Sequence, residues 1–225
     1  MARPPELLMV QNTPIGNGVT CMEVFTDQGV IVCLRHGLES GETNAVLCVP
    51  GALGGLSGPG RGIFHDICTQ LGGVRIHYRK PNDITHCIFD VLLVQHLLAD
   101  RGVNKAVLVG HSFGGAIAIA AGVHLGDATA GVITLASQVP GAEGVAELAG
   151  TPLLLIHGDQ DEILNHQCSQ YLYGAASDPK ELVIVPGEGH MFTGVSDALV
   201  DRVLAFSCSA FGLDIGAPRN SFAAE

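Results

Sequence analysis

The sequence has few basic side chains and little charge of either sign. Eleven Lys and Arg stand against twenty-two Asp and Glu, the net charge is −11, and charged residues make up 15% of the 225 residues. Nucleic acids and anionic membrane surfaces attract basic patches, so this balance argues against both as partners. The hydrophobic content of 47% predicts a globular protein with a large core. We expect a small-molecule substrate as the partner, and the sequence leaves the oligomeric state open.

Motifs for metals, nucleotides, secretion and membrane insertion are also missing. The chain contains no HExxH, no CxxC and no G-x-x-x-x-G-K-[ST], so we expect no metal and no cofactor. Its seven cysteines lie mostly among apolar residues, which predicts free thiols in a reducing compartment. No apolar run is long enough to span a membrane, and the first eighteen residues lack the apolar segment of a secretion signal. We expect a cytoplasmic protein.

What the chain does have is a hairpin followed by repeated strand-then-helix units. Apolar strands between helices are typical of a parallel sheet that is covered on both faces. The pattern predicts one α/β domain over residues 1–225, a three-layer sandwich of about eight mostly parallel strands with an N-terminal antiparallel hairpin and no cap domain. Residues 1–17 are expected to form an extended arm, residues 210–225 a frayed tail, and residues 143–149 a short helix.

The stretch "VLVGHSFGGAIAIA" places Ser112 between a predicted strand and a predicted helix. The pentapeptide G-H-S-F-G fits G-x-S-x-G, and this strand–turn–helix context is the one that a nucleophile elbow requires. Flanking glycines let the chain turn sharply, which raises the serine above the carboxyl edge of the sheet, where open α/β sheets bind ligands. The alternative is that the small residues serve only close helix–strand packing.

A serine hydroxyl needs a base to accept its proton, and the base needs a carboxylate to orient it. Later in the chain, "LLLIHGDQDEIL" places Asp161 after a buried strand, and "LVIVPGEGHMF" places His190 after the last strand. The order Ser, Asp, His is the one expected for this architecture, so Ser112, Asp161 and His190 form a predicted catalytic triad. Asp159 is the rival carboxylate, although its place near the strand end favours a role in the turn.

Two N–H donors are needed to stabilise the oxyanion of a tetrahedral intermediate. The first is expected to be the backbone N–H of Phe113, directly after the nucleophile. The second is expected from the glycine-rich loop "VPGALGGLSGPGRG", with Ala52 as the candidate and Leu53 as the second choice.

With "VPGALGG", "GHSFGG", "HGDQDEIL" and "GEGH" in this order, the chain resembles α/β-hydrolase-fold serine hydrolases. It is most similar to small, lidless members near the dienelactone-hydrolase and carboxylesterase branches. The resemblance spans roughly residues 18–207 and implies the same triad and the same two oxyanion donors. The sequence departs from the family in having Pro-Gly where His-Gly usually precedes the oxyanion residue. It also has serine where dienelactone hydrolases have a cysteine nucleophile, so their substrate does not transfer.

The spacing of the elements also bears on the substrate. Only residues 137–152 separate two strands between which many relatives carry a cap, so we expect an open site for small acyl groups. Arg61 and Arg79 are candidates to contact a substrate carboxylate, against the alternative of solvated surface arginines. The predicted function is hydrolysis of a small ester or thioester through an acyl-enzyme. The alternatives are a lactone or C–C bond hydrolase with the same triad, or a non-catalytic small-molecule receptor.

Overall fold

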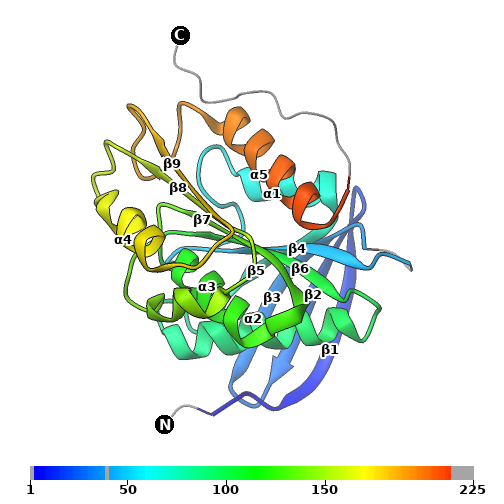
Figure 1. The fold of residues 1–225 in the computed structure, drawn as a ribbon. Coiled ribbons are helices and arrows are strands. Elements are labelled where there is room, and N and C mark those ends of the chain that lie inside the picture. Colours follow the sequence, from blue (N-terminus) through cyan, green and yellow to red (C-terminus); the bar gives the residue numbers. More distant parts are fainter. Residues whose placement is uncertain (1–2, 39–40, 214–225) are drawn as a thin grey trace.

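A mixed sheet of nine strands forms the middle layer of the molecule, and helices cover both of its faces (Figure 1). The structure is a computed structural model that describes residues 3–38 and 41–213. The strands are β1 (Leu7–Gly16), β2 (Val19–Thr26), β3 (Gly29–His36), β4 (Asn44–Val49), β5 (Gly73–His77), β6 (Lys105–His111), β7 (Thr129–Leu135), β8 (Leu153–Gly158) and β9 (Lys180–Val185). Their order in the sheet is β1-β2-β3-β5-β4-β6-β7-β8-β9. The neighbours from β1 to β5 are antiparallel and those from β5 to β9 are parallel.

The helices divide into two layers, one on each face of the sheet (Figure 1). Helices α1 and α5 lie on one face, and α2, α3 and α4 lie on the other. Successive residues of β6 point into different layers: Ala106 and Leu108 pack toward α2 and α3, whereas Val107 and Val109 pack toward α1 and α5. Both faces of this strand are therefore buried, which explains the uninterrupted apolar run at residues 106–109. The helices are α1 (Ile63–Leu71), α2 (Ile84–Ala99), α3 (Phe113–Leu125), α4 (Gln167–Ala175) and α5 (Ser196–Ala210), with 3₁₀ helices η1 (Gly126–Ala128) and η2 (Glu143–Leu148).

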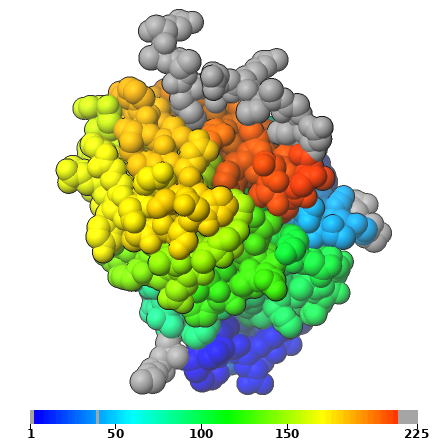
Figure 2. Space-filling view, in the orientation of Figure 1, coloured from blue at the N-terminus to red at the C-terminus, as the bar shows by residue number. Residues whose placement is uncertain are grey.

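Strand β1 raises the number of strands from the expected eight to nine. It pairs antiparallel with β2 through a tight turn in which Asn17 and Gly18 have φ of 53° and 71°, so the expected arm is a strand over most of its length. The strand is exposed on nearly every residue, and Figure 2 shows the blue N-terminal region at one end of the molecule. An edge strand of this kind has no alternation of apolar and polar residues to reveal it. Of the tail expected at 210–225, residues 214–225 lie outside the described residues.

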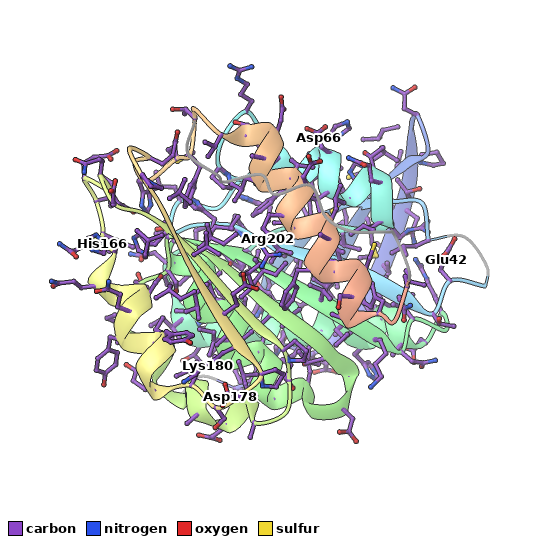
Figure 3. All side chains as sticks on the ribbon, turned by 45° about the horizontal axis from the view of Figure 1, so that its top comes forward. Glu42, Asp66, His166, Asp178, Lys180 and Arg202 are labelled. Atoms are coloured by element: carbon purple, nitrogen blue, oxygen red, sulfur yellow. The ribbon has the colours of Figure 1, made fainter. Side chains whose placement is uncertain are left out.

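Strand β9, at the opposite edge of the sheet, is held from both faces. The Nζ atom of Lys180 donates to the carbonyl oxygens of Tyr173 and Ala176 at the end of α4, at 2.8 and 2.7 Å. The next residue, Glu181, forms an ion pair with Arg202 of α5. Figure 3 shows Lys180 and Arg202 on the two sides of this strand. These contacts position the strand that leads into the loop carrying His190.

The crossing from β7 to β8 contains the single 3₁₀ helix η2, where a short helix was expected. Val145 and Leu148 of this helix are buried against the α3 layer. No cap domain is present within residues 3–38 and 41–213, and this confirms the expected three-layer fold. No helix in those ranges is long and apolar enough to cross a membrane. All seven cysteines are free thiols.

Candidate active site

The predicted nucleophile lies at the junction of β6 and α3. Ser112 has φ of 57° and ψ of −121°, a conformation that L-residues rarely adopt and that costs on the order of 1–3 kcal/mol. Two glycines make the sharp turn possible. A Cβ on Gly110 would lie 2.1 Å from the carbonyl oxygen of Gly114, and a Cβ on Gly114 would lie 2.3 Å from the carbonyl oxygens of Val49 and Pro50. Close backbone approach therefore requires glycine at both ends of the pentapeptide.

The carboxyl edge of the sheet surrounds this serine. The Ser112 N–H donates to the carbonyl oxygen of Leu135 at the end of β7, at 2.8 Å. On the other side, Gly51 begins the glycine-rich loop after β4, and a Cβ on that residue would lie 3.6 Å from the Cβ of Ser112. The loop that was expected to supply an oxyanion donor therefore passes directly beside the serine.

Asp161 and His190 are in direct contact, although they are far apart in the chain. The Nδ1–H of His190 donates to Oδ2 of Asp161 at 2.8 Å, and the Asp161 side chain is fully buried. The Oδ1 atom of Asp161 accepts the backbone N–H groups of Ile163 and Leu164, at 2.8 and 2.7 Å. Burial acts to raise the pKa of Asp161, but the hydrogen bonds from Leu164, His190 and Ile163 outweigh it and hold the pKa below its usual value. The carboxylate is thus ionised at neutral pH.

His111, the variable position of the pentapeptide, links His190 to the elbow. Its Nε2–H donates to the carbonyl oxygen of His190 at 3.1 Å, and the centroids of the two rings are 4.8 Å apart. Burial lowers the pKa of His111 to about 4, so this imidazole is neutral at physiological pH. Since His111 directly precedes Ser112, these contacts bring His190 to the edge of the sheet where the serine stands.

Tyr78 contacts Phe113 and the start of the loop that carries Ala52, the two segments of the predicted oxyanion hole. It is buried just past β5, and its hydroxyl donates to the carbonyl oxygen of Pro50, two residues before Ala52, at 2.9 Å. Its ring packs edge-to-face on the ring of Phe113, with the centroids 6.3 Å apart. The N–H of Phe113 belongs to the first residue of α3, where backbone N–H groups have no partner within the helix. Ala52 is half-buried, whereas Leu53 is 95% exposed.

The rival carboxylate Asp159, and Glu188 two residues before His190, make other contacts. The Asp159 carboxylate accepts the N–H of Gly187 at 2.8 Å and so joins the two loops that follow β8 and β9. The Glu188 carboxylate accepts the N–H of Gly194 at 3.2 Å. The ring of His190 bonds to Asp161 instead.

The two candidate arginines have different surroundings. Arg79 is not available to a substrate, because its side chain is fully buried and its Nε–H donates to the buried carboxylate of Asp90 at 2.5 Å. The prediction of a substrate contact for Arg79 is therefore wrong, and a solvated surface position is equally excluded. Arg61 is exposed in the glycine-rich loop. The preceding residue, Gly60, donates its N–H to the carbonyl oxygen of Met191 at 2.5 Å, which places this part of the loop beside His190.

Sequence reasoning missed two residues that contact the site. Tyr78 offered a signal, since a tyrosine just past a buried strand has a hydroxyl that needs a partner. The second residue is His157, which follows an apolar run in β8, a place typical of a structural residue. Its ring is in fact bonded to Asp161, with Nε2 at 3.0 Å from Oδ2. The i, i+4 spacing of His157 and Asp161 across a strand end gave no specific indication of this contact.

The fold and the residues gathered at the carboxyl edge of the sheet define an α/β hydrolase. The chain belongs to the phospholipase/carboxylesterase family, whose profile matches residues 86–208. Among curated proteins, the uncharacterised protein YfhR of Escherichia coli is 32% identical, over 46% of this chain and 43% of its own length. The chain thus spans less than half the length of that relative.

Solved structures of low sequence identity share the fold over most of the chain. Est1E from Butyrivibrio proteoclasticus has a TM-score of 0.71 at 15% identity and covers 85% of this chain and 99% of its own. An alpha-beta serine hydrolase homologue from Coxiella burnetii has a TM-score of 0.69 at 19% identity, with 86% and 99% covered. A dienelactone hydrolase from Anabaena variabilis has a TM-score of 0.67 at 19% identity, with 90% and 97% covered.

Proposed function

We propose that this hydrolase is a serine enzyme that cleaves a small ester or thioester through an acyl-enzyme intermediate. Ser112 is the nucleophile, His190 the general base and Asp161 the carboxylate that orients the base. The observation that carries the proposal is the 2.8 Å hydrogen bond between His190 and the buried, ionised Asp161, at the same sheet edge as the strained Ser112. A serine with this strained backbone does not stabilise the fold, because relaxing the strain at the turn would lower the energy of the folded state.

The reaction follows from these roles. The Nε2 atom of His190 accepts the Ser112 proton as the serine oxygen attacks the carbonyl carbon of the substrate, and Asp161 stabilises the resulting imidazolium. The backbone N–H groups of Phe113 and Ala52 stabilise the oxyanion of the tetrahedral intermediate. His190 then protonates the leaving group. Water, activated by the same histidine, hydrolyses the acyl-enzyme and releases the acid.

The open site supports a small substrate. The 3₁₀ helix η2 packs down onto the α3 layer, so the crossing from β7 to β8 adds little apolar wall above the sheet edge. Arg61 is the remaining candidate for contacting a carboxylate on the substrate, since its loop lies beside His190. The seven free thiols support a reducing, cytoplasmic location.

Replacement of the serine tests the proposal. Ser112→Ala should lower kcat for p-nitrophenyl acetate by about 10⁴-fold or more and abolish labelling by a fluorophosphonate probe, while the circular dichroism spectrum stays unchanged. Ser207→Ala is the matched control: Ser207 is fully buried in α5, its hydroxyl has no partner among the described residues, and its loss should leave both readouts unchanged. Turnover of Ser112→Ala within a few-fold of the wild type would refute the assignment. A panel of esters, thioesters and lactones then identifies the preferred leaving group.

A further inference from the structure

A second histidine is bonded to the carboxylate that orients His190. His157 is the fifth residue of β8 and is fully buried, and each of its ring nitrogens has a polar partner. The Nε2 atom lies 3.0 Å from Oδ2 of Asp161 and 2.9 Å from the carbonyl oxygen of Leu164. The Nδ1 atom lies 2.7 Å from the hydroxyl of Ser169 in α4. The mechanism above does not use this histidine.

The partners of His157 determine its tautomer. The Leu164 carbonyl and the ionised Asp161 carboxylate can only accept hydrogen bonds, so Nε2 must carry the proton. Burial lowers the pKa of His157, and the ring is therefore neutral at physiological pH. The Nδ1 atom is then an acceptor, and the Ser169 hydroxyl donates to it. Hydrogen bonds run in one direction, from Ser169 to His157 to Asp161.

We infer that His157 is a positioning residue for the proposed serine hydrolase: its Nε2–H fixes Asp161 so that Oδ2 faces His190, and it shares the negative charge of that oxygen. The inference rests on the proposed function, because it assigns His157 an effect on turnover through Asp161 and His190. The two imidazoles donate to the same oxygen, His157 at 3.0 Å and His190 at 2.8 Å. The backbone N–H groups of Ile163 and Leu164 occupy the other oxygen.

This arrangement has two consequences for turnover. First, a carboxylate held by four donors cannot rotate, so its Oδ2 stays aligned with the Nδ1–H of His190 while the imidazolium forms. Second, the bond from His157 shares the negative charge of Oδ2, so it sets how strongly Asp161 stabilises the imidazolium that forms on His190 during turnover. The hydrogen-bonded neighbour Ser169 enforces both effects, since it prevents the proton of His157 from moving to Nδ1.

The other groups that face His190 are known, so a pH effect can be attributed. The ring of His111 packs against it from the β6–α3 turn and is neutral down to about pH 4. The carboxylate of Glu162 accepts the backbone N–H of His190 at 3.3 Å from the β8–α4 loop. Asp161 is the ionised group that bonds to the ring itself. A substitution at position 157 removes a bond to Asp161 and leaves the residues at positions 111 and 162 unchanged, so its effect on His190 is expected to pass through Asp161.

Two substitutions at His157 separate positioning from packing. His157→Gln can keep an N–H donor near Asp161, whereas His157→Leu fills the space without a donor. We expect His157→Leu to lower kcat for p-nitrophenyl acetate about 10- to 100-fold with KM little changed. We also expect the acid limb of its kcat/KM profile to move up by about 0.5 to 1 pH unit. His157→Gln should restore most of kcat and the wild-type midpoint.

A matched control is available in His36, which is 2% exposed and bonds to Arg75 and Thr69 away from the site. His36→Gln should leave kcat and the acid limb unchanged when rates are normalised to the folded fraction measured by circular dichroism. A spectroscopic test needs no variant. In ¹⁵N-histidine NMR spectra of the wild type at neutral pH, His157 should show the neutral Nε2–H tautomer.

Several results would overturn the inference. One is a folded His157→Leu variant with the wild-type kcat and acid limb, and another is a His157→Gln variant as impaired as His157→Leu. If His157→Leu does not fold, the NMR spectrum and His157→Gln decide: a proton on Nδ1, a charged ring at neutral pH, or a Gln variant without rescue each refutes it. Failure of the proposed function looks different, because the wild type would then show neither turnover nor Ser112-dependent probe labelling.

Discussion

The Asp90→Asn variant should have a much lower free energy of unfolding than the wild type, with no specific effect on substrate binding. Asp90 and Arg79 are both fully buried, and their closest atoms, Oδ1 and Nε, are 2.5 Å apart. The other oxygen of Asp90 accepts the backbone N–H of Arg79 at 2.8 Å. In the Asn variant the guanidinium stays buried and loses its counter-charge. Within the described part of the chain, its Nη2 atom already has no partner.

The expected loss is about 3–5 kcal/mol of unfolding free energy, the usual cost of removing one member of a buried ion pair. For a chain of this size that corresponds to a melting temperature lower by about 6–20 °C. Urea unfolding followed by far-UV circular dichroism is the suitable assay, because the chain has no tryptophan for fluorescence. Asp83→Asn is the control: this exposed residue caps α2 by accepting the N–H of His86, and Asn is an equally good cap, so stability should change little. A loss below 1 kcal/mol for Asp90→Asn, together with a raised KM for anionic esters, would show that Arg79 serves the substrate after all.

Three further predictions concern catalysis, substrate size and pH. Asp161→Asn should lower kcat about 10⁴-fold, whereas Asp159→Asn, which weakens only a loop contact, should lower kcat less than tenfold. If steady-state kinetics gave the reverse order, Asp159 would be the carboxylate that orients His190. Along a series of p-nitrophenyl esters, kcat/KM should peak at acetate to butyrate. A deep acyl pocket would gain about 0.8 kcal/mol for each buried methylene, and this open site is expected to have no such pocket. A kcat/KM that keeps rising to decanoate would contradict the open site. The free energy of unfolding should fall as the pH drops from about 6.5 toward 4. Burial lowers the pKa of His36 and of His111 to about 4. Between these pH values the unfolded chain therefore binds more protons than the folded one. Urea midpoints measured across this range should correspond to a loss of unfolding free energy of up to about 3 kcal/mol for each of these two histidines. In a His111→Gln variant, stability should depend less steeply on pH. A wild-type stability that does not change with pH would contradict the burial of both histidines in the neutral form.

The central part of the fold was predictable because the inner parallel strands are buried on both faces. Runs such as residues 106–109 and 153–156 are apolar without alternation, and only a covered parallel sheet explains several such runs separated by helices. Strand β1 could not be found in this way, since it is an edge strand and nearly all of its side chains face water. Its one local signal was the turn at Asn17-Gly18, a pair that is typical of tight hairpins.

The contacts within the site were less predictable than its members. Motif and order identify Ser112, Asp161 and His190, because the chemistry demands those residue types after particular strands. The surroundings of Arg79 depend instead on how α2 packs against the sheet. A hint was available, since Asp90 interrupts the buried face of that helix between Cys87 and Val91, and a buried carboxylate requires a cation. The bond between His157 and Asp161 depends on the conformation of one loop, which composition does not encode.

The strained backbone of Ser112 has a consequence for laboratory evolution. A glycine at position 112 adopts a positive φ without penalty, so the folded state should lose strain just as the nucleophile disappears. A library selected only for heat resistance or expression yield should therefore enrich inactive clones at this codon. Selection for thermostability should be paired with a turnover screen, since at this position robustness and activity are opposed.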